Sequence, residues 1–263
     1  PTVFILFRAA GAALLFWIVL SMSKRSKIEG KDFLLMAVCG LFGVTINQLL
    51  FFHGLNASTP MNAGIIMASN PIMVAVMSFF WLKERLHTTQ WIGIFIGSLG
   101  AIALTTYGSK TVEAKMGDWW LMGNSLSYGV YLIAVKPLMQ KYNPLHVITW
   151  VFTFGAFFMV LFPPLYSDLP HLSLNTIPTA IWLKIVFVVV GVTFLTYLLT
   201  VMGLKYLSST VAAVFIYVQP IFVIAFSYLF YRIGWSADYT HAINQPTLFF
   251  MLIVFVGVYL TSQ

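Results

Sequence analysis

Residues 43–80, GVTINQLLFFHGLNASTPMNAGIIMASNPIMVAVMSFF, decide the fold, because residues 191–230 repeat their landmarks in the same order. The second segment reads GVTFLTYLLTVMGLKYLSSTVAAVFIYVQPIFVIAFSYLF. The landmarks are a Gly-Val-Thr start, a Gly-Leu pair and an amide followed by Pro-Ile, at 43–45 and 191–193, 54–55 and 203–204, and 70–72 and 219–221. Shared motifs in one order and spacing indicate an internal repeat.

The composition predicts the environment of this repeat. Of the 263 residues, 60% are hydrophobic and 8% are charged, and the mean hydropathy is +0.92. A soluble domain carries about 25% charged residues, so this chain has too few charges to cover a water-exposed surface. Apolar runs of about 20 residues, enough to cross a ~30 Å hydrocarbon layer as a helix, recur along the sequence. We therefore predict an all-α, polytopic membrane protein.

Nine membrane spans are predicted from these runs. The matched Gly-Val-Thr spans lie five apart, an odd number, so the second copy crosses the membrane in the opposite sense. Such inverted-topology repeats are the architecture of many secondary transporters, whose substrate site lies near the midplane. The predicted spans are 1–21, 32–55, 62–82, 90–107, 119–136, 144–162, 180–203, 209–231 and 247–262.

The repeat also predicts how the spans divide between two halves. The second half holds five spans and the first only four, and Pro1 aligns with Pro144. The span at 119–136 therefore has no counterpart, and we expect a ten-helix protein whose first helix is missing from this chain; an intact nine-helix protein is the alternative. The halves are predicted at 1–108, lacking its first helix, and at 118–263.

Basic residues predict the orientation. Cytoplasmic loops carry an excess of Lys and Arg, and alternate loops hold nine on one side and four on the other. This places Gln263 in the cytoplasm, in a multi-pass protein of the cell (inner) membrane, and it accounts for the net charge of +7 without nucleic acid as a partner. The nine are Lys24, Arg25, Lys27, Lys31, Lys83, Arg85, Lys136, Lys141 and Lys205; the four are Lys110, Lys115, Lys184 and Arg232.

These residues resemble a known family. The opening from Pro1 to Arg8, the segment ASTPMNAGIIMASNPIMVAVMSFFWLKERL and the following QWIGIFIGSLGAIALTTYG are similar to the drug/metabolite transporter superfamily, specifically its EamA-type ten-helix exporters. The pattern covers residues 57–108 well, and 119–231 carries a weaker copy. The resemblance implies two inverted five-helix halves and export of small metabolites, such as amino acids or drugs, from a central cavity.

Proline inside an apolar helix predicts a break. Pro71 and Pro220 cannot donate a backbone hydrogen bond and crowd the carbonyls of Met67 and Ile216. In lipid a freed carbonyl costs several kcal/mol unless a cavity, water or side chain satisfies it. In inverted halves the two kinks would face each other, shaping a cavity and allowing alternating access. The alternative is a structural kink, which is common in membrane helices.

Polar side chains within spans are the candidate substrate contacts, because they are costly in hydrocarbon and usually face inward. Each could equally form a hydrogen bond between helices. A lining of amides and phenols suits a small amphipathic or amino acid-like solute. The candidate substrate-binding residues are Asn47, Gln48, Asn62, Asn70, Tyr128, Tyr131, Tyr197, Tyr217 and Gln219.

Arg8 is the one charge that we place well within a span. A guanidinium stays ionised, so Arg8 could attract an anion or clamp the structure; its symmetry counterpart is Val151. All seven acidic residues fall in loops or at span ends. Ion-driven carriers usually keep a carboxylate in the membrane, so the sequence favours facilitated diffusion or exchange.

A membrane enzyme acting on a lipid or glycosyl substrate is the alternative function. Such enzymes need clustered acids or histidines for acid–base or metal chemistry, and the sequence spacing predicts no such cluster, no catalytic residue, no metal and no cofactor. The expected partners are a small-molecule substrate and membrane lipids, with the protein a monomer or homodimer. Gly93, Gly97 and Gly100 favour close helix packing within the bundle over dimerisation.

Overall fold

The computed structural model describes residues 2–23, 28–58, 60–106, 115–171, 178–233 and 245–263. Four basic residues used to predict the orientation, Lys24, Arg25, Lys27 and Lys110, lie outside these ranges. The acids Glu113 and Asp238 also lie outside them.

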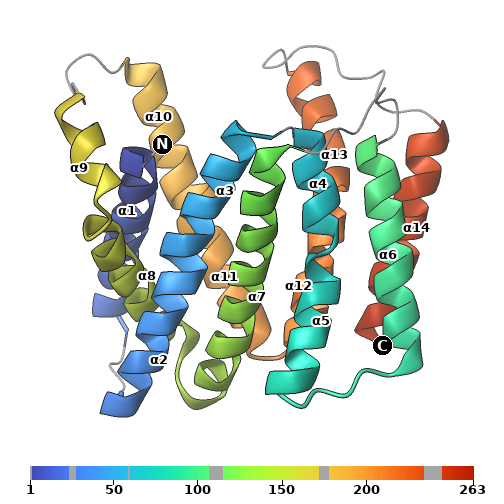
Figure 1. Ribbon diagram of the computed structural model, residues 1–263, viewed down its shortest axis with the longest axis horizontal. Helices are drawn as coiled ribbons and strands as arrows, with labels where there is room; N and C mark the ends of the chain where they lie inside the picture. Colours follow the sequence, from blue (N-terminus) through green and yellow to red (C-terminus); the bar gives the residue numbers. More distant parts are fainter. Residues whose placement is uncertain (1, 24–27, 59, 107–114, 172–177, 234–244) are drawn as a thin grey trace. The chain divides into compact units, whose positions relative to one another are not determined.

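Helices occupy every predicted span, and no strand occurs within the described ranges, so the all-α fold is confirmed. Several spans are built from two or three consecutive helical segments (Figure 1). The first half contains α1 (Thr2–Ser21), α2 (Gly30–Gly40), η1 (Leu41–Ile46), α3 (Asn47–Asn56), α4 (Pro60–Ala68), α5 (Asn70–Trp81) and α6 (Thr88–Thr106). The second contains α7 (Met116–Lys141), α8 (Pro144–Val160), α9 (Pro164–Asp168), η2 (Leu169–His171), α10 (Thr179–Phe187), η4 (Val188–Leu195), α11 (Thr196–Leu204), α12 (Ser209–Val214), η5 (Phe215–Val218), α13 (Gln219–Arg232) and α14 (Gln245–Ser262).

Within the described ranges, four helical stretches are long and apolar enough to cross a membrane: Thr2–Ser21, Gly30–Asn56, Asn62–Trp81 and Thr179–Leu204. Thr88–Ala103, Pro144–Val160, Ser209–Val218 and Leu248–Ser262 are shorter apolar helices. The longest helix, α7, is in neither group, and its central turns contain Asn124, Ser125 and Ser127, all of them buried. These side chains face protein, and the hydroxyl of Ser127 donates to the Phe42 carbonyl (2.6 Å).

The described chain divides into two compact units. Unit 1 contains Pro1–His53 and Leu126–Ser208, and unit 2 contains Gly54–Ser125 and Ser209–Gln263. Each unit thus takes helices from both halves of the sequence. The division of the sequence into repeats at 1–108 and 118–263 stays a prediction.

In unit 1, the two Gly-Val-Thr landmarks both lie in π-helical segments. Gly43, Val44 and Thr45 lie in η1, and the matching triplet 191–193 lies in η4. A π-helix has a wider turn than an α-helix and is rare, frequently marking a functional site. The same rare backbone therefore occurs at matched positions of the repeat.

Each π-helical segment packs against a helix from the other half of the sequence. η1 lies against α8, and η4 lies against α1. The first contact is close because Gly155 has no side chain: a Cβ there would lie 2.5 Å from the Cβ of Val44. Thr45 adds a hydrogen bond from its hydroxyl to the Gly155 carbonyl (2.9 Å). Small residues allow such close backbone approach within a membrane bundle.

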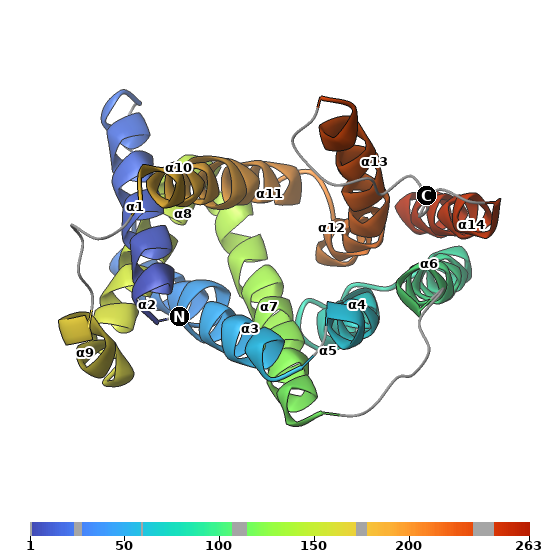
Figure 2. The ribbon, with the colours of Figure 1, turned by 90° about the horizontal axis from the view of Figure 1, so that it is seen from above.

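In unit 2, α6 lies beside α14 (Figures 1 and 2). Glycines of α6 lie in this contact. Gly93 lies beside Gly257 and Thr261, and Gly100 lies beside Val254, so α6 and α14 run antiparallel. Gly97 lies beneath the buried ring of Tyr217. The structure thus shows the predicted packing within the bundle, between the corresponding last helices of the two halves.

A cluster of ion pairs joins the start of α2 to the end of α7 in unit 1. Lys141 contacts Glu29 (2.7 Å) and Asp32 (2.6 Å), and Lys31 contacts the other Glu29 oxygen (3.0 Å). Tyr142 donates its hydroxyl proton to Asp32 (2.6 Å) and accepts a hydrogen bond from the Glu29 N–H (3.1 Å). Hydrogen bonds from Lys141 and then Lys31 hold the pKa of the Glu29 carboxyl below its ordinary value of 4.5.

The glycine contact of unit 2 can be tested by adding one methyl group. In Gly97→Ala the new Cβ would lie 2.6 Å from the Tyr217 ring, so we expect overpacking to destabilise the protein by about 1–3 kcal/mol. Gly203→Ala is the matched control, because a Cβ at Gly203 meets nothing within 4 Å, and alanine improves helix propensity by up to about 1 kcal/mol. Thermal unfolding of the detergent-purified protein measures the stability change of each variant. Equal melting temperatures for the two variants would contradict the packing.

The ion-pair cluster predicts a pH-dependent stability. Because the folded-state pKa of Glu29 is lowered, its contribution is complete above its unfolded pKa, near 4.5, and is lost as pH falls through the lower folded value. Glu29→Gln is expected to lower the melting temperature near neutral pH, with the difference from wild type shrinking below about pH 4.5. Asp168→Asn, at a carboxylate without an ion pair among the described residues, should show no such change. A constant Glu29→Gln difference across this range would exclude the mechanism.

Candidate functional site

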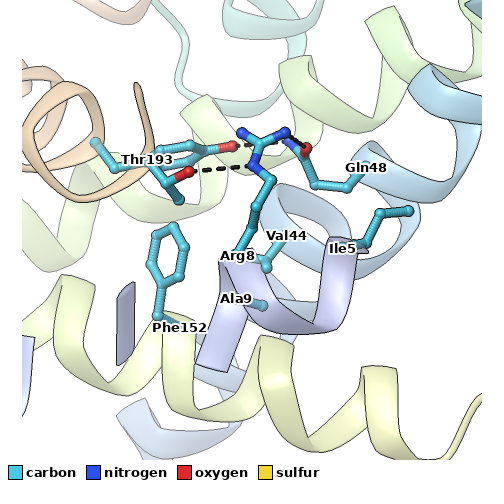
Figure 3. A pocket seen from close by; sticks show the side chains of 8 residues that line it. Ile5, Arg8, Ala9, Val44, Gln48, Phe152 and Thr193 are labelled. Atoms are coloured by element: carbon cyan, nitrogen blue, oxygen red, sulfur yellow. Dashed lines mark hydrogen bonds between the residues drawn. The ribbon is translucent and has the colours of Figure 1, made fainter. Parts of the chain in front are cut away.

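The candidate site of unit 1 is centred on Arg8 of α1 (Figure 3). Its neighbours on the helix, Ile5 and Ala9, are buried, so Arg8 starts from a packed face and is itself half-buried. The Nε of Arg8 donates to the Thr193 hydroxyl (3.1 Å), and Nη1 donates to the Gln48 side-chain oxygen (2.9 Å). The guanidinium thereby links α1 to α3 and to the π-helical segment η4.

Gln48 extends this contact into a polar network. Its amide nitrogen donates to Asn47 Oδ1 (3.1 Å) and to the Tyr197 hydroxyl (3.4 Å). Tyr197 in turn donates to the Gly43 carbonyl (3.1 Å), which belongs to η1. Both π-helical segments therefore help to position the network: η1 through its Gly43 carbonyl and η4 through Thr193.

Aromatic rings surround the network. Tyr197 lies 6.2 Å from Tyr131 and 4.9 Å from Phe152 between ring centroids, and Tyr128 lies 6.1 Å from Tyr131. Tyr131 is fully buried, and its hydroxyl makes no hydrogen bond to a described residue. Arg8 also lies over the rings of Phe4 (5.9 Å) and Phe52 (5.5 Å), whose negative faces attract a cation.

A small cavity opens beside the guanidinium (Figure 3). Its volume is about 10 Å³, close to the room that one water molecule needs. Its polar lining comes from Arg8, Gln48, Thr193 and Tyr197, and its apolar lining from Ile5, Ala9, Val44 and Phe152. A metabolite is larger than this space, so it would fit beside Arg8 only after the lining side chains move.

Six sequence-predicted residues thus occur together in unit 1: Arg8, Asn47, Gln48, Tyr128, Tyr131 and Tyr197. The other candidates, Asn62, Asn70, Tyr217 and Gln219, lie in unit 2. Whether all of them line one substrate site stays a prediction.

The unit 2 candidates have separate surroundings. Asn62 donates to both carboxylate oxygens of Asp118 (3.1 and 2.9 Å) at the start of α7, where the Ser58 hydroxyl also donates. Tyr217 is buried on Gly97, and its hydroxyl donates to the Ile94 carbonyl (3.3 Å). Asn70 is buried, with an Oδ1 that accepts no hydrogen bond from a described residue. Gln219 is exposed at the start of α13.

Both proline motifs coincide with helix breaks. α4 ends at Ala68 and α5 begins at Asn70, so Pro71 occupies the first turn of a new helix, where its missing N–H costs nothing. Pro220 likewise follows Gln219 at the start of α13, directly after the 3₁₀ turn η5. The side chain of Pro220 is not among the side chains that the structure describes. Within unit 2, α5 lies against α12 and α4 against η5, so the two interrupted helices contact each other.

Sequence reasoning missed three aromatic residues of the site: Phe4, Phe52 and Phe152. Phenylalanine is abundant in this chain, with 24 copies, so composition carries no signal for them. Among the described residues, no group of three or more His, Cys, Asp or Glu side chains has the arrangement of a metal site.

Comparisons with known proteins agree with this architecture. An uncharacterized transporter, YyaM, from Bacillus subtilis (strain 168) is 26% identical over 84% of this chain and 72% of its own length. An uncharacterized transporter from Archaeoglobus fulgidus is 25% identical, over 90% of this chain and 78% of its own. A probable terminal-alkyne amino-acid exporter from Streptantibioticus cattleyicolor is 25% identical over 58% of this chain and 50% of its own.

A solved crystal structure shares the fold, with a TM-score of 0.76 over 99% of this chain and 86% of that one, at 16% sequence identity. The sequence profile of the EamA-like transporter family matches residues 1–106 and 115–263, which is nearly the whole sequence. The chain is therefore a polytopic membrane protein and belongs to the EamA-like transporter family.

Proposed function

We propose that this protein is a secondary transporter that exports or exchanges a small metabolite, amino acid-like or amphipathic, by alternating access around a central cavity. The carrying observation is the polar network of Arg8, Gln48, Thr193 and Tyr197, assembled within apolar helices beside a cavity. Polar groups at such depth are costly and usually functional. The named activity of one relative, a probable amino-acid exporter, supports an amino acid-like solute.

The interrupted helices support movement. In unit 2, α4–α5 and α12–α13 are each broken at an amide-proline pair, and in unit 1 two π-helical segments carry the network. A helix can bend most easily where its backbone hydrogen bonds are already interrupted. Alternating access requires such elements, because the cavity of about 10 Å³ must widen to admit a solute.

Facilitated diffusion or exchange is the proposed mode, because all seven acidic residues of the sequence fall in loops or at span ends. The cell (inner) membrane is the proposed location, with the C-terminus in the cytoplasm, following the bias of Lys and Arg between loops. The protein would act as a monomer or homodimer, with a small-molecule substrate and surrounding lipids as its partners.

Reconstitution tests the transport function directly. Liposomes containing the purified full chain should take up or exchange at least one labelled solute from a panel of amino acids, nucleobases and amphipathic cations. Thr193→Val, which removes the hydroxyl that accepts from Arg8 Nε, should reduce this flux about tenfold or more, because a hydrogen bond to a charged group is worth about 1.5–3 kcal/mol. Absence of flux for the whole panel, under any imposed gradient, would remove the transporter proposal.

Asn70 offers a separate test of substrate contact. Its buried Oδ1 lacks a partner among the described residues, and an unsatisfied buried group costs about 1–3 kcal/mol. Asn70→Leu should therefore keep or raise the melting temperature while it lowers flux or changes selectivity. Ser78→Ala is the matched control, because Ser78 Oγ is equally buried and unsatisfied two turns along α5; it should leave flux unchanged. Unaltered transport by Asn70→Leu would exclude Asn70 from the substrate path.

A further inference from the structure

Arg8 is a charged residue that makes no ion pair with any described residue. Its two hydrogen-bond acceptors, Thr193 Oγ1 and Gln48 Oε1, are both neutral. A guanidinium remains ionised, and a desolvated charge without an opposite partner is costly. The neutral network therefore leaves a positive site half-buried among apolar helices.

Arg8 also retains hydrogen-bonding capacity. A guanidinium has five N–H donors in a planar fork, and the recorded bonds use one at Nε and one at Nη1. Nη2 makes no hydrogen bond to a described residue. The rings of Phe4 and Phe52 attract the cation but cannot accept hydrogen bonds in the plane of the fork. A carboxylate could, because its two oxygens match two parallel N–H groups.

The neighbours of Arg8 suit an exchange of partners. The Gln48 oxygen is a neutral acceptor on a side chain with several rotatable bonds. The amide nitrogen of Gln48 donates to Asn47 and Tyr197, so Gln48 keeps these hydrogen bonds when its oxygen leaves Arg8. An anionic group that enters the cavity would displace the Gln48 oxygen and form stronger, charge-assisted hydrogen bonds. Thr193 can keep its bond to Nε, because its own hydroxyl proton goes to the Val188 carbonyl (2.9 Å).

The repeat shows that this feature is not required by the fold. Position 8 corresponds to Val151 in the second half, and Val151 is fully buried. The threonines at equivalent positions also differ in partner: Thr45 donates to the Gly155 carbonyl, whereas Thr193 accepts from Arg8. The fold thus accommodates an apolar residue at the matched site, and only one half carries the cation.

We propose that the transported molecule carries a carboxylate and that Arg8 binds this group, taking it in place of the Gln48 oxygen. The inference rests on the proposed transport function and narrows it to anions and zwitterions. Arg8 then acts as an orienting contact for one end of the solute, and the surrounding rings contact the remainder.

Chemical protection tests the binding step without requiring transport. Phenylglyoxal modifies accessible arginines, and peptide mass spectrometry reports the rate at each position. In the full chain in liposomes, benzoate and L-phenylalanine should slow the modification of Arg8 roughly tenfold at saturating concentration, whereas benzamide and L-phenylalaninamide should not. Arg85, exposed in the loop between α5 and α6, is the internal control and should react at one rate throughout. Equal rates at Arg8 with acid and amide would overturn the inference.

Competition measurements separate this inference from the transport proposal. The ratio of flux for an acid to flux for its amide should exceed one in the wild type and fall about tenfold in Arg8→Gln, with Arg8→Lys between them. Lys184→Gln, at an exposed residue, should keep the wild-type ratio. If acid and amide move equally well, or if Arg8→Gln lowers both fluxes by the same factor, transport stands and Arg8 is a structural clamp. If neither acid nor amide moves or protects Arg8 while another solute of the panel is transported, the carboxylate inference falls and the transport proposal stands; absence of flux for the whole panel removes both.

Discussion

The structure depends on one constraint: in an apolar surrounding, each backbone carbonyl that a helix releases must find another donor. The two π-helical segments show how this chain meets it. In η1, the Phe42 and Gly43 carbonyls accept from the hydroxyls of Ser127 and Tyr197. In η4, the Val188 and Gly191 carbonyls accept from the hydroxyls of Thr193 and Thr196, each five residues further along the chain; Thr196 is the first residue of α11. Because an unsatisfied carbonyl costs several kcal/mol in lipid, these hydroxyls supply the carbonyls of the wide turns with donors beyond the backbone, and two of them, on Thr193 and Tyr197, belong to the Arg8 network.

Much of the fold was predictable because hydrophobicity alone decides where a membrane helix lies. Each predicted span coincides with helix, usually within two residues at its ends. The breaks at Asn70 and Gln219 were also predictable, since proline chemistry is local. The π-helical backbone was not, because an extra residue in a turn leaves the composition unchanged; the repeated Gly-Val-Thr triplet marked the places without revealing their geometry.

The site was only partly predictable, for a different reason. Arg8 was conspicuous as a charge in an apolar run, but its partners lie 40 and 185 residues away, and sequence periodicity carries no information at that separation. Tyr217 was a candidate substrate contact because it is a phenol within a span. In the structure, its ring packs on Gly97 and its hydroxyl donates to the Ile94 carbonyl, so both ends of the side chain contact protein. A polar group in a membrane helix therefore indicates an inward direction more reliably than it indicates a role.

The antiparallel contact between α6 and α14 has a consequence for how copies of this protein could associate. Small-residue faces are the usual means by which membrane helices pair between molecules, yet here Gly93, Gly97 and Gly100 are already covered by α14 and Tyr217. A second copy could pack against this glycine face only if α14 first moved away from α6 of the same molecule. A contact between copies would then use other surfaces, such as the one that carries the exposed phenylalanines Phe222 and Phe226 of α13.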